Sequence, residues 1–190
     1  MAEGVRLRLL VALAAGLLTV ASCGTGGTTA GSTVTAPAFN DSDVMFLQMM
    51  IPHHEQGVLI VQLARDHDVR TAVKELSAAI EVTQESEISD MKHWLTDWHR
   101  PTAANPDPQA HTAHGGMRMT DPDLVGALTK TAGPEFERRY LDVLTGHQHS
   151  AVELAQTETA EGVNPQAKEL AKRIFESRTA EIKQLLAFTT

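Results

Sequence analysis

The sequence of 190 residues contains a single cysteine, Cys23. One cysteine cannot form a disulfide within the chain or build the thiolate cage of a structural zinc site. Aromatic residues make up only 4% of the sequence, which argues against a sandwich or barrel of aromatic-rich strands. Lys and Arg number 16 against 24 Asp and Glu, and this acidic excess argues against a nucleic-acid partner. Any metal chemistry must therefore use His, Met and carboxylates.

The first 22 residues are predicted to be a secretory signal peptide. Arg6 and Arg8 precede an apolar stretch from Leu9 to Val20, which is too short for a comfortable membrane span. The run Val20-Ala21-Ser22-Cys23 resembles a bacterial lipobox, in which the cysteine receives lipid and becomes the mature N-terminus. An ordinary signal peptide that happens to end near a cysteine is the alternative.

Residues 23–39 are predicted to form a flexible tether, because Gly, Thr and Ser are abundant there and apolar side chains are few. We therefore expect a protein of the cell envelope. Lipid on Cys23 would anchor it to the outer side of the cytoplasmic membrane, or the protein would be secreted.

A gapless internal repeat relates residues 46–91 to residues 140–185. A shift of 94 residues aligns the two segments with eleven identities in 46 positions, including His53 with His147 and Glu87 with Glu181. Chance alone would give only a few identities. We therefore expect two copies of one structural unit.

Each copy has the pattern of two helices. In the first copy, residues that recur at alternating steps of four and three predict one helical seam; they are Phe46, Met50, His53, Gly57, Ile60 and Ala64. A second stripe comprises Val73, Leu76, Ile80, Gln84, Glu87, Met91, Trp94 and Trp98. In the second copy, Gly162 predicts a left-handed helix end, and Asn164 with Pro165 predicts the start of the next helix.

Two hairpins with apolar seams can bury those seams only against each other. The sequence therefore predicts an all-α fold, a four-helix bundle built from two repeated helical hairpins. The bundle domain would cover residues 40–190, with repeats at about 42–99 and 134–188. The segment from Arg100 to Met119 contains several Pro and Gly residues, together with His and Met, and is predicted to be a loop, with a short helix after it from Asp121-Pro122 to Lys130.

Polar residues interrupt both seams. In an antiparallel hairpin that turns between residues 68 and 69, His53 faces Gln84, and in the second hairpin His147 faces Arg178. A Glu lies one turn away in each hairpin. Burying such groups unpaired costs about 1–3 kcal/mol each, so they must bind something.

Two hypotheses explain these buried polar residues. The first is a hydrogen-bond network that fixes helix register, with His53 bound to Glu87 and Gln84, and Arg178 bound to Glu181. The second is a metal site in which imidazole, carboxylate and thioether groups converge between helices. The guanidinium of Arg178 repels a cation, so the metal hypothesis applies mainly to the first repeat.

Copper, particularly Cu(I), is the metal that the residues favour, because Met and His occur together without spare thiols. The Glu-x-x-His motif of ferritin-like di-iron centres is missing from the sequence. The candidate ligands in the first repeat are His53, His54, Met50, Met91 and Glu87. The loop has the same composition, with further candidates at His111, His114, Met117 and Met119, although a merely flexible polar loop explains it equally well.

The segment Met49-Met50-Ile51-Pro52-His53-His54-Glu55-Gln56-Gly57-Val58 resembles the signature of the bacterial domain-of-unknown-function family 305. The segment Gln84-x-x-Glu87-Ile88-x-x-Met91-x-x-Trp94-Leu95 is similar to the second motif of that family. The resemblance covers about residues 40–188. It implies a ferritin-like four-helix bundle, usually exported, and some members are implicated in copper binding and tolerance.

The site residues that the resemblance implies are His53, His54, Gln84, Glu87, Met91, His147 and Glu181. The second copy departs from the His-His pattern, because it reads His147-Gln148, with His149 one place later. Arg178 stands where the first copy has Gln84, and it could pair with Glu181 or reach Glu87 across the bundle.

The leading functional hypothesis is a lipid-anchored, extracytoplasmic protein that binds copper and buffers or sequesters it. The alternative is a non-catalytic structural or interaction module whose buried His, Glu and Arg residues only fix helix register. We expect no enzyme, because the sequence shows no Ser–His–Asp arrangement that can be placed and no Gly-rich phosphate loop.

Overall fold

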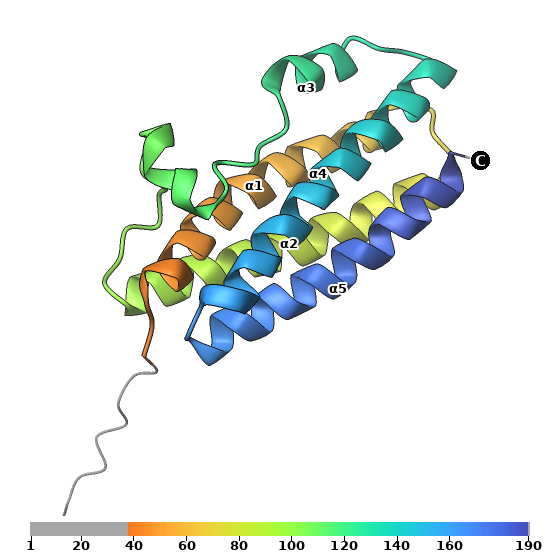
Figure 1. Ribbon diagram of the computed structural model, residues 1–190. Coiled ribbons are helices and arrows are strands. Elements are labelled where there is room, and N and C mark those ends of the chain that lie inside the picture. Colours follow the sequence, from red (N-terminus) through yellow and green to blue (C-terminus); the bar gives the residue numbers. More distant parts are fainter. Residues whose placement is uncertain (1–37, 190) are drawn as a thin grey trace, which may run out of the picture. The chain divides into compact units, whose positions relative to one another are not determined.

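The structure, a computed structural model, describes residues 38–189, without the side chains of Pro108, Ala113 and His114. Cys23, the predicted signal peptide and the tether up to residue 37 lie outside these residues. Four long helices form a bundle (Figure 1): α1 (Asp41–Asp66), α2 (Thr71–Asp97), α4 (Pro134–Glu161) and α5 (Pro165–Phe188). The connection between α2 and α4 contains a short 3₁₀ helix, η1 (Pro108–His114), and the short helix α3 (Pro122–Leu128). The predicted all-α four-helix bundle is confirmed.

The long helices are arranged as two hairpins. α1 packs along α2 and α4 along α5, while α1 also packs against α4 and α2 against α5. A shift of 94 residues carries Thr71, the first residue of α2, onto Pro165, the first residue of α5. The same shift places α1 within α4. The helix bounds therefore follow the spacing found in the sequence.

Two clusters of buried apolar side chains fill the bundle. One lies at the end where α1 begins and includes Met50, Leu95 and Leu170. The other lies at the end where α1 finishes and includes Ile60 and Tyr140. Because each seam residue recurs every three or four positions, it lies on the helix face that points to the other three helices. This burial is the main reason why the four helices associate.

The turn between α4 and α5 differs in one respect from the prediction. Asn164 caps α5 as expected, since its side chain accepts hydrogen bonds from the backbone of Gln166 and Ala167. Gly162, however, has φ −67° and ψ 157°, which is extended rather than left-handed backbone. Glycine is needed at this position because a side chain would not fit, not because the backbone is left-handed. A Cβ atom there would lie 2.2 Å from a carboxyl oxygen of Glu158.

The start of α1 is fixed to this turn by Asp43. Asn40 and Asp43 form a capping box, in which each side chain accepts a hydrogen bond from the backbone of the other residue. The Asp43 carboxylate also accepts hydrogen bonds from the backbone N–H groups of Val163, at 3.1 Å, and Asn164, at 2.9 Å. Burial raises the pKa of the neighbouring Glu158 to about 9, and the negative charge of Asp43 adds to this shift.

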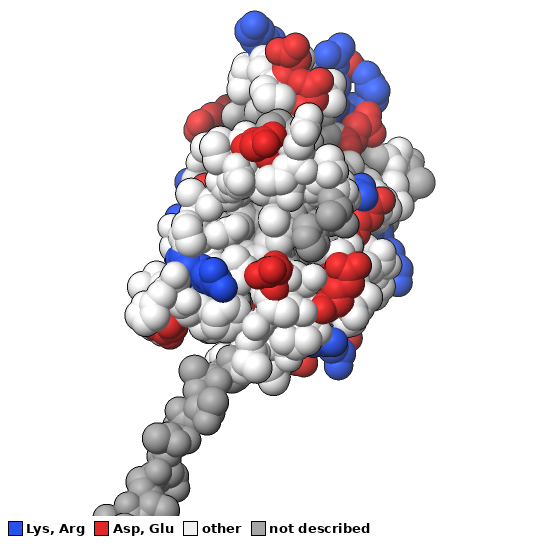
Figure 2. All heavy atoms as spheres, turned by 60° about the vertical axis from the view of Figure 1, so that its left-hand side comes forward, with Lys and Arg blue, Asp and Glu red and all other residues white. Residues whose placement is uncertain are grey.

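The surface is mixed in charge. On the face shown in Figure 2, acidic and basic side chains are scattered singly or in small groups among uncharged ones. Among residues 38–189, none of the helices combines the length and the apolar character that crossing a membrane requires. The bundle itself therefore offers no membrane-spanning element within the described residues.

The raised pKa of Glu158 predicts a pH dependence of stability. Its ordinary pKa is 4.5 and its folded-state pKa about 9, so between these values the folded state holds a proton that the unfolded state lacks. Stability then falls as pH rises, by up to about 1.4 kcal/mol per pH unit. We expect the free energy of unfolding to fall between pH 7 and 9. Glu158→Gln, which imitates the protonated acid, should flatten this fall in urea denaturation measured across the range.

Glu169→Gln is the matched control, because Glu169 is exposed on α5. It should leave the pH dependence of the wild-type protein unchanged. The prediction would be contradicted if the free energy of unfolding fell equally with pH in the wild-type protein and the Glu158→Gln variant.

Candidate metal centre

A layer of polar side chains lies inside the bundle, about halfway along its four long helices. Each helix supplies two of them, and in each helix members of the apolar clusters precede and follow the pair. Seven of the eight are buried and one is half-buried, so bulk water satisfies few of their polar groups. We call this set the polar layer; it consists of His53, His54, Gln84, Glu87, His147, Gln148, Arg178 and Glu181.

One half of the polar layer is a paired charge network. The guanidinium of Arg178 donates to Glu87 from Nη2 at 2.5 Å and to Glu181 from Nη1 at 3.1 Å. His54 Nε2 lies 2.8 Å from the same Glu87 oxygen, and the amide of Gln148 donates to Glu181 at 2.5 Å. The shift of 94 residues relates the pair His54–Glu87 to the pair Gln148–Glu181. Gln148 therefore performs in the second hairpin the hydrogen-bonding role of His54 in the first.

The charges of this network follow from its contacts. Burial alone would raise the pKa of Glu87, but the hydrogen bond from His54 and the charge of Arg178 outweigh it and lower that pKa. Burial raises the pKa of Glu181, in spite of the adjacent Arg178. Burial also lowers the pKa of His54, so at neutral pH this ring is neutral and donates its Nε2 proton to Glu87.

The other half of the polar layer is unpaired. The rings of His53 and His147 are stacked, with centroids 3.9 Å apart and planes 16° from parallel. Among the described residues, neither ring nitrogen of His53, nor Nε2 of His147, nor either amide atom of Gln84 has a hydrogen-bond partner. A Cβ atom on Gly57 would lie 2.4 Å from Oε1 of Gln84 and 2.8 Å from Nε2 of His147. The glycine in α1 thus leaves the space that these two atoms occupy.

Both stacked rings are neutral at physiological pH. Burial lowers the pKa of His147 to about 3, and the nearby His54 adds to this shift. Burial lowers the pKa of His53 well below 6.5 as well, followed by the effects of His147 and His54. Each neutral ring carries one nitrogen with a free lone pair. The unpaired half therefore presents buried nitrogen donors that need not release a proton before they bind a cation.

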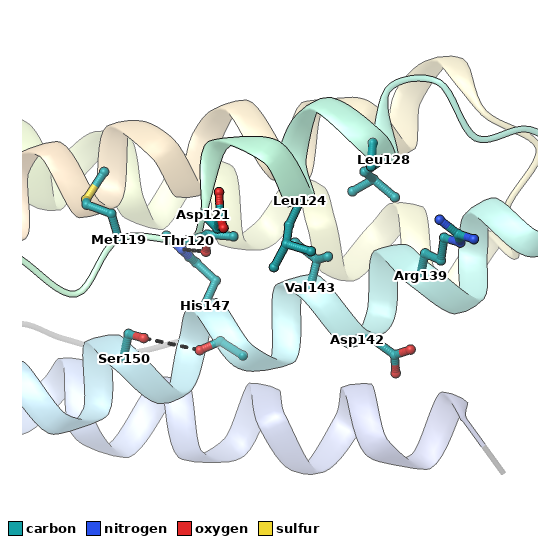
Figure 3. Close-up of a pocket in the computed structure, with 12 residues that line it drawn as sticks. Met119, Thr120, Asp121, Leu124, Leu128, Arg139, Asp142, Val143, His147 and Ser150 are labelled. Carbon is teal, nitrogen blue, oxygen red and sulfur yellow. Dashed lines mark hydrogen bonds between the residues drawn. The ribbon is translucent and has the colours of Figure 1, made fainter.

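His147 also lies at the floor of a cavity between α3 and α4. The cavity has a volume of about 520 Å³ and a largely apolar wall. Figure 3 shows the hydroxyl of Thr120 beside the His147 ring, and the two share a hydrogen bond of 2.9 Å to Nδ1. The side-chain amide of Gln56 makes two hydrogen bonds to the backbone of Thr120. It accepts from the N–H group and donates to the C=O group, both at 2.8 Å. The segment around Thr120 therefore covers the unpaired half on this side.

The structure brings together most of the residues that the sequence singled out. His53, His54, Glu87, His147 and Glu181, with the supporting Gln84 and Arg178, all lie in the polar layer. Met50 and Met91 are fully buried in the apolar cluster next to it, and His149 is exposed on α4. Within residues 38–189, no three His, Cys, Asp or Glu side chains gather as a ready-made metal-binding group. An ion would therefore need the unpaired nitrogens, the Gln84 amide or a methionine.

The loop candidates do not gather at one place. His111 is buried with Nδ1 3.1 Å from the sulfur of Met45 in α1, and it borders a cavity that Met117 also lines. Met119 instead lines the cavity between α3 and α4. The side chain of His114 lies outside the described residues.

The predicted hydrogen bonds of His53 to Glu87 and Gln84 are wrong. Glu87 binds His54 instead, because adjacent positions point about 100° apart on a helix, and neither His53 nor Gln84 has a hydrogen-bond partner for its side chain among the described residues. The predicted pair of Arg178 with Glu181 is confirmed, and Arg178 binds Glu87 as well. The sequence also gave no role to Thr120, whose position in a loop carries no periodic signal. Gln148 had a signal, since the repeat aligns it with His54.

Solved structures share this fold. The DUF305 fragment from Deinococcus radiodurans has a TM-score of 0.69 and 22% identity, covering 80% of this chain and 97% of that one. A DUF305 protein from Streptomyces coelicolor, predicted to be secreted, has a TM-score of 0.70 and 27% identity, covering 76% and 89%. CopM in its Cu(II)-bound form has a TM-score of 0.64 and 28% identity, covering 77% and 94%. CopM is also known in Cu(I)-bound and Ag-bound forms.

No curated protein matches this chain. The family described as domain of unknown function DUF305 matches residues 43–189, which include all four long helices from the third residue of α1 onward. The chain belongs to the DUF305 family.

Proposed function

We propose that this protein binds a transition-metal ion, copper, as cargo outside the cytoplasm, and that it buffers or sequesters the ion without catalysis. The observation that supports the proposal most is the buried, unpaired stack of His53 and His147. A buried polar group without a partner costs about 1–3 kcal/mol. A bundle that needed only a fixed register would gain stability by replacing these rings with apolar ones of similar shape, so their presence favours a ligand.

The chemistry of the donors favours copper over a hard cation. Imidazole nitrogen suits copper, and the described residues offer no cluster of His, Cys, Asp and Glu for a hard cation. The similarity to CopM, which binds copper and silver, also favours copper as the ion. Because the stacked rings are nearly parallel, their lone pairs lie in separate planes, and the rings must tilt apart to bind one ion together.

The alternative function, a structural or interaction module, is supported by the other half of the polar layer. Arg178 pairs with Glu87 and Glu181 through its two terminal nitrogens without any ligand, and among the described residues only its Nε lacks a partner. Such a network fixes register by itself, since removing one partner of a buried ion pair costs about 3–5 kcal/mol. The two functions differ in what they predict for His53.

The first test replaces His53 with Phe, which keeps a flat ring against His147 but carries no nitrogen. Without metal, we expect this variant to melt at or above the wild-type temperature, because unpaired buried nitrogens are removed. With Cu(I) or Ag(I) at about 100 times the dissociation constant, the wild-type protein should gain about 2.7 kcal/mol, a rise of roughly 5 °C or more. The variant should lose most of this rise and at least about tenfold in affinity, a change of roughly 1.4 kcal/mol. Calorimetry measures the melting temperatures, and competition with a Cu(I) chelator measures the affinities.

His149→Ala is the matched control, because His149 is exposed on the same helix two residues from His147. It should retain the wild-type affinity and melting rise. A melting temperature of the wild-type protein that does not respond to Cu(I), Cu(II) or Ag(I) would favour the structural module instead.

The lowered pKa values of the stack predict that binding is insensitive to mild acid. The pKa of His147 is about 3, so this ring stays neutral at pH 5, and burial lowers the pKa of His53 well below 6.5. Protons therefore compete with the ion far less between pH 7 and 5 than they would at exposed histidines. Affinity for Ag(I) measured over this range should change by less than about threefold. A site of ordinary histidines with a pKa near 6.5 should lose roughly tenfold or more per proton displaced.

We also propose that the protein is lipid-anchored through Cys23, supported by the lipobox-like run before it and by the similarity to a Streptomyces protein predicted to be secreted. In a bacterial host that processes lipoproteins, the wild-type protein should fractionate with membranes and incorporate labelled palmitate. Cys23→Ser should abolish the label and release the protein from the membrane fraction. Equal fractionation of the two would contradict the anchor and leave the bundle proposal untouched.

A further inference from the structure

The contact between the loop and α1 contains an unusual pair of atoms. His111 has none of its surface exposed, and its Nδ1 atom lies 3.1 Å from the thioether sulfur of Met45. Its other nitrogen, Nε2, lies 2.7 Å from the backbone carbonyl oxygen of Asn105. The ring is thus held from both sides, by one residue of the loop and one residue of α1.

The hydrogen bond to Asn105 decides which nitrogen carries the proton. A carbonyl oxygen can only accept, so Nε2 of His111 is the donor. In the neutral ring, Nδ1 then has a lone pair instead of a hydrogen, and this lone pair faces the sulfur of Met45. A thioether sulfur also has only lone pairs. Two electron-rich atoms therefore face each other at 3.1 Å, and a positive charge between them would convert a repulsive contact into an attractive one.

The arrangement has the geometry of a metal-binding pair. With metal–nitrogen and metal–sulfur bonds of about 2.0 and 2.3 Å, an ion between atoms 3.1 Å apart would see them at an angle of roughly 90°. One ion can thus bind both with little movement. Metal-binding histidines usually donate their other N–H group to a carboxylate or a backbone carbonyl, which fixes the tautomer. Asn105 provides this contact for His111.

A second thioether, that of Met117, and an open cavity lie next to this pair. Met117 and His111 both line a cavity of about 480 Å³ between the loop and α1. Met45 and Met117 both pack, half-buried, against the apolar cluster at this end of the bundle. The loop is fastened here as well, because Gln48 of α1 donates a hydrogen bond of 2.7 Å to the carbonyl of Pro101. His111 and Met117 therefore border space that an ion can enter, and the sulfur of Met45 lies against the His111 ring.

We propose that Met45 and His111, with Met117 as third ligand, form an outer site for a soft monovalent metal ion, Cu(I), separate from the polar layer. Thioether and imidazole donors together select Cu(I) over harder cations. Met45 precedes His53 by eight residues of α1, a distance along the helix of about 12 Å. One ion cannot contact both sites. This inference rests on the proposed function in that both concern soft-metal cargo, but its donors are different residues.

The test uses Ag(I), which has the charge and softness of Cu(I) and does not change oxidation state. In the purified protein with ¹³C-labelled methionine methyl groups, Ag(I) should shift the Met45 and Met117 signals. The double variant Met45→Leu, Met117→Leu keeps the apolar volume and should bind one fewer Ag(I) ion than the wild-type protein. The control His149→Ala changes an exposed histidine of α4 that belongs to neither proposed site, and it should retain the wild-type stoichiometry.

The His53→Phe variant separates this proposal from the preceding one. It should retain the Ag(I)-induced shifts of Met45 and Met117 while losing the ion of the polar layer. If the shifts persist but His53→Phe changes nothing, the outer site stands and the inner site fails. The outer site is overturned if the Met45 and Met117 signals stay unchanged while Ag(I) binds. It is also overturned if the double variant binds as many ions as the wild-type protein.

Discussion

The guanidinium of Arg178 lies in the middle of the bundle with none of its surface exposed, held by one carboxylate from α2 and one from α5. A buried charge of this kind is tolerated only when its partners are correctly placed, because an unpaired one costs several kcal/mol. Glu87 and Glu181 are therefore fixed in height relative to each other. Their own partners, His54 and Gln148, fix α1 and α4 to the same level. The register of all four helices therefore depends on this one ion-pair network.

The same network explains why the two hairpins are chemically different although their backbones are related by one shift. Arg178 and Gln84 occupy equivalent positions, and so do His53 and His147. Arg178 reaches across to Glu87 of α2 and binds Glu181 on its own helix, whereas the amide of Gln84 lies in the space beside Gly57 and has no partner among residues 38–189. Charge is satisfied in one half of the layer, while neutral donors accumulate in the other. A cation that enters the layer meets repulsion from Arg178 on one side and free lone pairs on the other.

The sequence predicted the fold because burial follows periodicity. Seam residues at steps of three and four predicted the four long helices. The repeat predicted that the two hairpins pack together, since a hairpin with one apolar face needs another to cover it. The sequence could also place a His and a Glu from each copy in the core. It could not decide between His53 and His54 as the partner of Glu87, because that choice depends on the rotation of α1 about its axis. Nor could it predict Met45 beside His111, since the path of the connection across α1 is set by loop contacts such as that of Gln48 to Pro101.

The two candidate sites differ in how their donors are kept available, and this difference bears on the order in which they would fill. In the polar layer His147 lies behind Thr120, whose backbone is bound twice by Gln56 and whose hydroxyl is bound to His147. An ion that enters from the cavity between α3 and α4 must open these contacts. At the outer site, His111 and Met117 line a cavity next to α1 and already face it. Filling the outer site requires no break in the bundle, whereas filling the inner one separates a ring stack. An ion that meets this protein would therefore bind first at the loop, and the inner site would exchange its ion more slowly.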